Sequence, residues 1–256
     1  AAPPSIEEQQ RIPHHLIGHL SVEKDYNAGD FEQEALQRME NLFQKHDSII
    51  LVGGSGFYMK ALTEGFDHMP DTDVELRTAL NQQYLHKGLQ PLQEELLEKD
   101  PDYYAKVDRK NPQRLIRALE VIRSTGKPYS SFRKSYKAER PFRSIKIGLE
   151  LPRPELYQRI NKRVEVMVAR GLEDEARSLL KHRNTNSLQT VGYKEFFQYF
   201  DGELKREEAV SEIQKNTRRY AKRQMTWFKR DPEISWFSPH NMAAIHSHLV
   251  RIWDQD

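Results

Sequence analysis

The stretch "SIILVGGSGFYMKAL", residues 48–62, constrains the fold more than any other part of this chain. Residues 48–52 form a continuous apolar run, which is typical of a strand buried on both faces of a parallel sheet. Gly53, Gly54 and Gly56 follow directly, and an apolar helical spacing begins after them. A strand, a glycine turn and a helix in this order predict a βαβ unit of an open parallel sheet.

The neighbouring segments extend this prediction to the rest of the chain. Strands are expected at 14–20, 145–151 and 233–238, where apolar residues alternate with polar ones or form short runs. Helices are expected at 27–47, at 152–180 with an interruption at Gly171, and at 205–230. The N-cap of the first of these is expected at Gly29 or Asp30.

A block between the strands is mostly helical. Three segments, 73–88, 89–100 and 111–126, each end on a stop signal: Gly88, Asp100 followed by Pro101, and Gly126. We expect this block to be an insertion over the carboxyl edge of the sheet. The predicted domains are therefore an α/β core formed by residues 1–66 and 141–256, and a mostly helical insertion of residues 67–140.

Composition limits the classes of site. The chain has no cysteine, which excludes disulfides and thiolate metal sites. His14, His15 and His19 lie in a predicted strand, where they are too far apart for a zinc site. No metal-binding residue is predicted. Because no apolar run reaches the length of a membrane span, we expect no membrane segment, and we expect a cytoplasmic protein.

Basic residues concentrate in two segments although the formal net charge is only +2. Residues 205–230 contain nine Lys or Arg against three Glu, and residues 133–146 contain six against one. Either segment alone is compatible with a solvated helix face. Together they favour a polyanion such as nucleic acid as the partner.

Four segments carry candidate site residues. The glycine turn with Ser55 is either a tight turn or an anion site at a helix N-terminus. Arg114 and Arg117 share one helix face and either bracket an anion or form surface pairs with Glu120. Tyr193 and Lys194 after Gly192 either stack on a nucleobase or belong to the core and its loop.

The fourth segment is the basic helix. Arg218, Lys222, Met225 and Lys229 share one face with Arg219, Arg223, Thr226 and Arg230 beside them, which predicts a broad cationic strip. A neighbouring stripe is predicted to be more buried, and it contains Val210, Ile213, Thr217, Tyr220, Gln224 and Phe228.

Several segments resemble one known family in order and spacing. They are "PHHLI", "VGGSGFYMKAL", "QRLIRALEV", "TGKP", "LYQRINKRVEVMVARGLEDEA", "TVGYKE" and "TRRYAKRQMTWF". The resemblance is to bacterial tRNA dimethylallyltransferases, the tRNA isopentenyltransferase family, and it covers nearly the whole chain. It implies an α/β fold with a P-loop-kinase-like parallel sheet flanked by helices, and a helical insertion that grips the anticodon stem-loop of tRNA.

The resemblance also implies an activity. Members transfer a dimethylallyl group from dimethylallyl diphosphate to N6 of adenosine 37, in tRNAs that read codons beginning with U. The flipped base and the diphosphate meet in a channel, and Mg²⁺ assists departure of the diphosphate. The expected partners are the tRNA anticodon stem-loop and dimethylallyl diphosphate, and the protein is expected to be a monomer.

Site residues follow from the resemblance position by position. Arg117 and Ser55 are the expected catalytic residues. Arg117, Lys60 and Arg218 are expected at the diphosphate. The expected tRNA contacts are Ser55, Arg77, Gln113, Arg114, Leu115, Ile116, Arg117, Gln189, Thr190, Val191, Gly192, Tyr193, Lys194, Lys222, Arg223, Gln224, Met225, Thr226, Trp227, Phe228 and Lys229.

Two features of the family pattern do not occur in this sequence. They are a P-loop of the type G-P-T-x-x-G-K-[ST] and an S-D-S-x-Q segment whose Asp is the expected general base. We therefore expect the chain as given to be an inactive fragment. The alternatives to a tRNA-modifying enzyme are an isopentenyltransferase acting on free adenine nucleotides and a non-catalytic RNA-binding protein.

Overall fold

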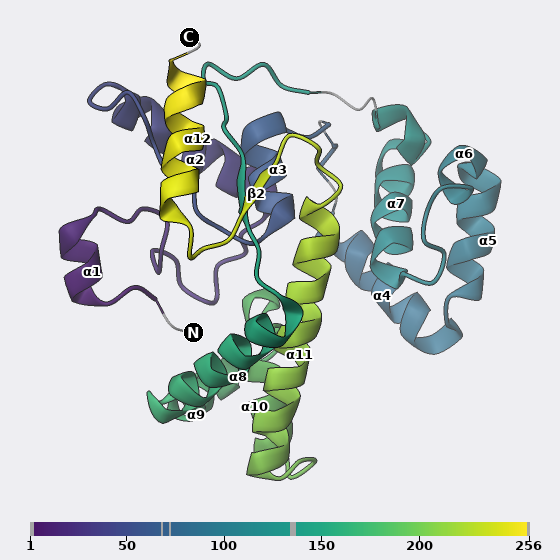
Figure 1. Ribbon diagram of the computed structural model, residues 1–256. Coiled ribbons are helices and arrows are strands. Elements are labelled where there is room, and N and C mark those ends of the chain that lie inside the picture. The colour runs from purple at the N-terminus through teal and green to yellow at the C-terminus, as the bar shows by residue number, and fades with distance from the viewer. Residues whose placement is uncertain (1–2, 68, 72, 134–136, 255–256) are drawn as a thin grey trace. The chain divides into compact units, whose positions relative to one another are not determined.

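The computed structural model describes residues 3–67, 69–71, 73–133 and 137–254 (Figure 1). It divides into two compact units. The first unit comprises residues 1–62 and 142–256, and the second comprises residues 63–141.

The first unit contains most of the helices and a small sheet. Its elements are α1 (Ile6–Arg11), α2 (Ala28–Phe43), the greater part of α3 (Gly56–Glu64), β1 (Ile147–Leu149), α8 (Arg153–Ala169), α9 (Leu172–Ser178), the 3-10 turns η2 (Leu180–His182) and η3 (Asn186–Leu188), α10 (Tyr193–Phe200), α11 (Arg206–Phe228), β2 (Ser235–Phe237) and α12 (Met242–Trp253).

The sheet confirms the predicted α/β class with parallel strands. β1 and β2 pair in parallel, with Gly148 opposite Trp236. A side chain at Gly148 would clash with the Trp236 ring, 2.5 Å from the position of its Cβ. Lys146, just before β1, forms ion pairs with Asp231 at 2.7 Å and Glu233 at 2.8 Å. These pairs fix the end of α11 and the start of β2 beside β1.

Two predicted strands are wrong. Residues 48–52 are irregular, and the side chains of Ile50 and Val52 are 87% and 85% exposed. The apolar run predicted burial between neighbouring strands, but the described residues pair only β1 with β2. Residues 14–20 are irregular as well, and Leu16 has a positive φ of 60°. The N-cap of α2 is Asn27, two residues before the first of the two expected positions.

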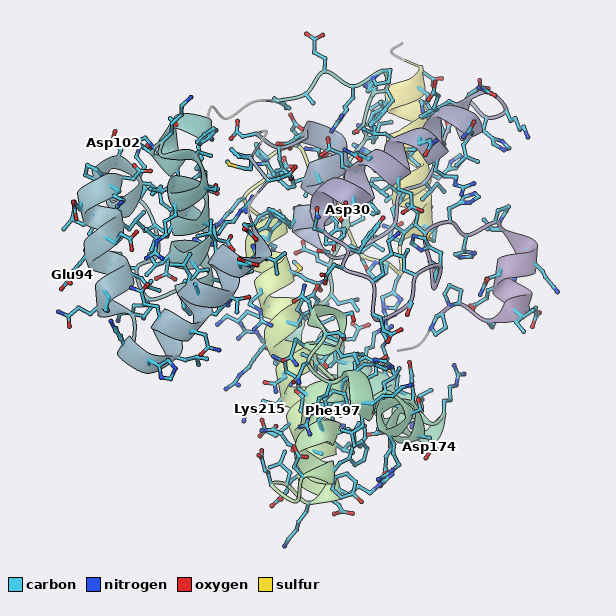
Figure 2. All side chains as sticks on the ribbon, turned by 180° about the vertical axis from the view of Figure 1, so that it is seen from behind. Asp30, Glu94, Asp102, Asp174, Phe197 and Lys215 are labelled. Atoms are coloured by element: carbon cyan, nitrogen blue, oxygen red, sulfur yellow. The ribbon has the colours of Figure 1, made fainter. Side chains whose placement is uncertain are left out.

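A hydrophobic cluster joins α8, α9, α10 and α11. Its most deeply buried members include Phe196, Ala176 and Ile213, and Leu172 and Phe197 are almost as deeply buried. Phe197 belongs to this cluster, whereas Asp174 of α9 lies exposed (Figure 2). The cluster holds the long helix α11 by its first half.

The second unit is helical, as its stop signals predict. Its elements are the end of α3, α4 (Val74–Lys87), α5 (Gln90–Lys99), α6 (Pro101–Tyr104), α7 (Pro112–Thr125) and the 3-10 turn η1 (Tyr129–Phe132). Gly88 and Gly126 cap α4 and α7 with positive φ values of 73° and 69°. Asp100 is buried and accepts hydrogen bonds from Tyr103 and Ser130, which joins α6 to η1.

The core of the second unit lies between α4, α5 and α7. Leu80, Leu92, Leu96, Leu115 and Leu119 are completely buried there. Among the residues that the structure describes, no helix is long and apolar enough to cross a membrane.

Candidate functional site

The glycine turn before α3 is in contact with the basic helix α11. The side-chain amide of Gln224 donates to the carbonyl oxygen of Gly54 at 2.7 Å. A Cβ on Gly54 would lie 2.1 Å from Gln224 Nε2, and one on Gly56 would lie 2.2 Å from the Trp227 ring. The two glycines therefore permit close approach of α11. Ser55 lies exposed between them, and its carbonyl accepts the first helical bond, from Met59.

The second half of α11 carries the predicted cationic strip. Arg219, Lys222, Arg223, Lys229 and Arg230 are exposed. The neighbouring stripe is less uniform than predicted, because Tyr220 is 42% exposed. The Arg223 guanidinium lies 5.7 Å from the centre of the Tyr220 ring, which places a cation beside an exposed aromatic face.

Two cations of the strip have partners inside the first unit. Arg218 is half-buried and donates to Asn161 Oδ1 at 2.6 Å, over the ring of Tyr157. Lys229 pairs with Glu150 at 2.8 Å and lies over the Trp236 ring. These contacts fix Arg218 against α8. Lys229 stays on the surface of the first unit, beside β1 and β2.

Residues 189–194 form the loop before α10 and the first two residues of that helix. Tyr193 is only 9% exposed, and its hydroxyl donates to Glu175 at 2.8 Å. Burial, and then the hydrogen bond to Glu175, raise the pKa of Tyr193 well above its ordinary value. Of the two interpretations of this residue, the structure supports the core one. The expectation that its ring stacks on a nucleobase is wrong for this conformation.

The buried side chain of Glu195 fixes the loop before α10 in position. It is 4% exposed, and it accepts from the backbone N–H of Gly192 and from the Asn216 side chain, both at 2.8 Å. Gly192 takes a positive φ of 106°. Gln189, Thr190 and Lys194 are exposed, and Val191 is half-buried.

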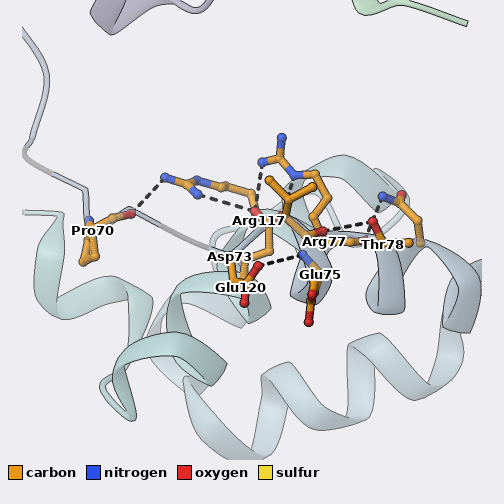
Figure 3. Close-up of polar contacts among 9 residues, drawn as sticks. Pro70, Asp73, Glu75, Arg77, Thr78, Arg117 and Glu120 are labelled. Carbon is orange, nitrogen blue, oxygen red and sulfur yellow. Dashed lines mark hydrogen bonds and ion pairs between the residues drawn. The ribbon is translucent and has the colours of Figure 1, made fainter. Parts of the chain in front are cut away.

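Three of the arginines expected at the substrates belong to the second unit. Arg77 of α4 and Arg117 of α7 both donate to the carboxylate of Glu120, which is completely buried (Figure 3). Gln113 and Arg114, in the first turn of α7, are exposed. The sequence suggested surface pairs with Glu120, but this carboxylate lies inside the protein and Arg77 is its closer partner.

Two expected tRNA contacts lie in the core. Leu115 and Ile116 are 0% and 2% exposed, since they belong to the apolar face of α7. Their side chains cannot reach an RNA in this conformation. By contrast, sequence reasoning did not reveal the contact between Gln224 and Gly54, which joins residues far apart in the chain.

Comparison with known proteins gives the family. The family model described as IPP transferase matches residues 1–231. The tRNA dimethylallyltransferases of Cytophaga hutchinsonii and Christiangramia forsetii are 50% and 51% identical to this chain, covering 96% and 92% of it and 81% and 78% of their own lengths. The chain belongs to the IPP transferase family.

A solved structure of an IPP transferase agrees with this assignment. The tRNA isopentenylpyrophosphate transferase of Bacillus halodurans superposes with a TM-score of 0.68 at 33% identity, over 98% of this chain and 82% of the other. The resemblance identified from the sequence motifs is thereby confirmed.

Within this IPP transferase, the cations expected at the diphosphate lie in both units. Lys60 is exposed on α3, and Arg218 faces Asn161, so both belong to the unit that contains Ser55. Arg117 belongs to the second unit, where it also donates to the carbonyl oxygen of Pro70.

The residues that the structure describes offer no ready-made cluster of metal ligands. They contain no group of three or more His, Asp or Glu side chains that fits a metal ion. His19 instead contacts Glu34, which also accepts from the Tyr26 hydroxyl. No residue of this chain is therefore assigned to Mg²⁺.

Proposed function

We propose that this IPP transferase moves a dimethylallyl group from dimethylallyl diphosphate to N6 of adenosine 37, in tRNAs that read codons beginning with U. The observation that carries the proposal is the exposed cationic strip of α11, which is anchored through Gln224 and Trp227 on the turn that bears Ser55. Family membership adds the class of reaction.

The strip is suited to an RNA backbone. Arg219, Lys222 and Arg223 are exposed on α11 and Arg230 is exposed in the turn after it, where they can neutralise successive phosphates. Trp227 is 43% exposed at the glycine turn and offers an aromatic face on which a base can stack. A base held there would lie near the hydroxyl of Ser55, which is available for a hydrogen bond.

Gln189, Thr190 and Lys194 are proposed to extend this surface. They are exposed at the start of α10, and Glu195 joins this segment to α11 through Asn216. Two half-buried residues of α11 among the expected contacts, Met225 and Phe228, are proposed to support the strip from beneath.

In the proposed reaction, the adenine N6 forms a bond to the allylic carbon of the dimethylallyl group. The bond from that carbon to the diphosphate oxygen breaks, and N6 loses a proton to a base. Cations near the departing diphosphate lower the barrier, because negative charge accumulates on the oxygen that leaves. Arg117, Lys60 and Arg218 are the proposed cations, and the base is not assigned to a residue.

The remaining parts of the proposal concern conditions and partners. Mg²⁺ is proposed as a cofactor that offsets the charge of the diphosphate. The protein is proposed to act as a cytoplasmic monomer with the anticodon stem-loop as its RNA partner. The division into an α/β core and a tRNA-contacting insertion of residues 67–140 is part of the same proposal.

The test uses the natural protein that contains residues 1–256, with dimethylallyl diphosphate and Mg²⁺. Its substrates are an anticodon stem-loop with adenosine at position 37, the same stem-loop with guanosine there, and AMP. We expect the dimethylallylated nucleoside, detected by mass spectrometry, from the adenosine stem-loop only. A stem-loop whose anticodon reads codons beginning with C should react more slowly.

Two outcomes would contradict the proposal. Transfer to AMP without transfer to the stem-loop would indicate an isopentenyltransferase of free nucleotides. Tight binding of the stem-loop without any transfer would indicate an RNA-binding protein without this activity.

A further inference from the structure

Glu120 is a buried carboxylate with two arginine partners. It lies in α7 and is completely buried. Arg77 Nη2 donates to Oε2 at 2.9 Å while Arg77 Nε donates to Oε1, so Arg77 binds both oxygens. Arg117 Nη1 donates to Oε2 at 3.4 Å from one turn earlier on α7 (Figure 3).

The arrangement is asymmetric in burial. The Arg77 side chain is 56% exposed and the Arg117 side chain is 33% exposed, whereas the carboxylate between them is inaccessible to solvent. Burying a carboxylate is costly, and replacing a buried ion pair by apolar residues often stabilises a protein. The observed pairing is therefore weak evidence for a role in stability. It is better explained by what it does to the two exposed guanidinium groups.

Pairing in this way restricts each arginine. A bidentate contact fixes the plane of the Arg77 guanidinium at the end of a long side chain. Arg117 is restricted by Glu120 on one side and by the carbonyl oxygen of Pro70 on the other. Both guanidinium groups are thereby held on one carboxylate, and the Arg77 side chain is the more exposed of the two.

We propose that Glu120 is a positioning residue that fixes Arg77 and Arg117 as one site for a phosphate anion. This inference rests on the proposed function, which supplies two sources of that anion: the RNA backbone and dimethylallyl diphosphate. Glu120 contacts neither substrate. It acts through the two arginines, which come from helices α4 and α7 and are 40 positions apart in the chain, from 77 to 117.

A double-mutant cycle tests the proposal in the full chain. The proteins are the wild type, E120Q, R77A and R77A/E120Q, with a parallel set built on R117A. Binding of a fluorescent anticodon stem-loop and of dimethylallyl diphosphate is measured separately, so that the two sources of phosphate are distinguished. Far-UV circular dichroism and thermal unfolding of each protein are recorded alongside.

If Glu120 acts through an arginine, the variant that lacks both residues should lose no more ligand affinity than the weaker-binding of the two single variants. We expect E120Q to weaken stem-loop or diphosphate binding by about tenfold, and the double variant to be no weaker than the worse single variant. Non-additivity with stem-loop identifies the RNA backbone as the anion, and non-additivity with diphosphate identifies the small substrate. Additive losses for both ligands, or E120Q binding like the wild type, would overturn the proposal.

A second variant keeps the proposal testable if E120Q does not fold. R77K keeps the charge and leaves Glu120 with Arg117, but it cannot make the bidentate contact. We expect weaker binding of the stem-loop or of dimethylallyl diphosphate, whichever of the two supplies the anion, with an unchanged salt dependence. An affinity equal to that of the wild type would show that charge alone matters and would overturn the proposal for Arg77. A wild type that binds neither ligand would refute both this inference and the proposed function, whereas binding with additive losses refutes the inference alone.

Discussion

Gln224 of α11 donates to the carbonyl oxygen of Gly54 at 2.7 Å, and thereby fastens the basic helix to the turn that carries Ser55. One helical turn later the ring of Trp227 lies against Gly56. The helix is therefore positioned by the same short turn that offers the exposed hydroxyl. An RNA held along α11, as proposed, would pass close to this turn.

Alanine substitutions at the three glycines of the turn before α3 should lower the free energy of unfolding by different amounts. A Cβ at Gly53 meets Met59 Sδ at an ordinary 3.4 Å, whereas one at Gly56 would lie 2.2 Å from the Trp227 ring. We expect Gly53→Ala to change the free energy of unfolding by no more than about 0.5 kcal/mol. Gly56→Ala should destabilise by about 1–3 kcal/mol, because a rigid ring must shift.

Gly54→Ala should destabilise the protein by an intermediate amount, about 1 kcal/mol. The Gln224 side chain can rotate away from the new methyl group, but it then loses its hydrogen bond. Urea unfolding followed by tryptophan fluorescence reports on the first unit, which contains Trp227, Trp236 and Trp253. In the Gly56→Ala background, Trp227→Ala should recover part of the loss. Equal changes at the three glycines would show that α11 does not pack here.

The second unit shows how far local signals can predict this fold. Gly126 ends α7 in the left-handed conformation, as its stop signal predicts, and Asn111 caps the first turn of the same helix. Such caps depend on residues close together in the chain, so they are visible in the sequence. The contact between Arg77 and Glu120 joins residues 43 positions apart, and no local pattern contains it.

The prediction of a strand at 48–52 is wrong for a different reason. A strand is defined by hydrogen bonds to a neighbour, and an apolar run predicts only that a neighbour is expected. Ile50 and Val52 are exposed instead. In the site, the cations of α11 were visible as a helical strip, whereas burial of Ile116 and Tyr193 depended on tertiary packing.

The ion pair between Glu95 and Arg123 should make the second unit sensitive to acid. Arg123 donates to both carboxylate oxygens, at 2.9 and 2.6 Å. The hydrogen bond from Arg123, opposed by burial, holds the pKa of Glu95 below its ordinary value. A carboxyl group with a lowered pKa stabilises the folded state above its unfolded pKa of about 4.3, and this stabilisation is lost as pH falls through the folded pKa.

We therefore expect the pair to contribute about 1 kcal/mol or less at pH 7 and progressively less below about pH 4.3. Arg123→Met should remove this contribution and flatten the acid dependence. Amide hydrogen exchange within α5 and α7, corrected for the intrinsic effect of pH, measures it in the second unit. Glu94→Gln, at an exposed neighbour on α5, serves as the control. Parallel pH profiles for wild type and Arg123→Met would contradict this account.

Stem-loop binding by the strip of α11 should depend strongly on salt. Each contact between a cation and a phosphate releases a counterion, so the logarithm of the binding constant falls linearly with the logarithm of the salt concentration. Arg219→Ala and Arg230→Ala should each lower the magnitude of that slope by up to about 0.9. Arg38→Ala and Lys45→Ala remove exposed cations elsewhere on the first unit and should leave it unchanged. Binding that does not respond to salt would exclude an electrostatic RNA surface.

Arg117 and Arg114 should separate binding of the diphosphate from binding of RNA. Arg114 is exposed in the first turn of α7, whereas Arg117 is 33% exposed and held by Glu120. If Arg117 stabilises charge on the departing diphosphate, Arg117→Ala in the natural protein should slow single-turnover transfer at least about a hundredfold. Its stem-loop affinity should change little.

Arg114→Ala should show the opposite pattern, with weaker stem-loop binding and normal transfer once the RNA is saturating. The physical reason is that a charge needed only as the bond breaks affects the rate, whereas a charge that holds the RNA affects occupancy. Quench-flow transfer to radiolabelled stem-loop at saturating RNA, combined with equilibrium binding, measures both quantities on the same proteins. If Arg117→Ala strongly weakens RNA binding yet transfers at the normal rate when RNA is saturating, Arg117 serves the RNA and the diphosphate depends on Lys60, Arg218 and other groups.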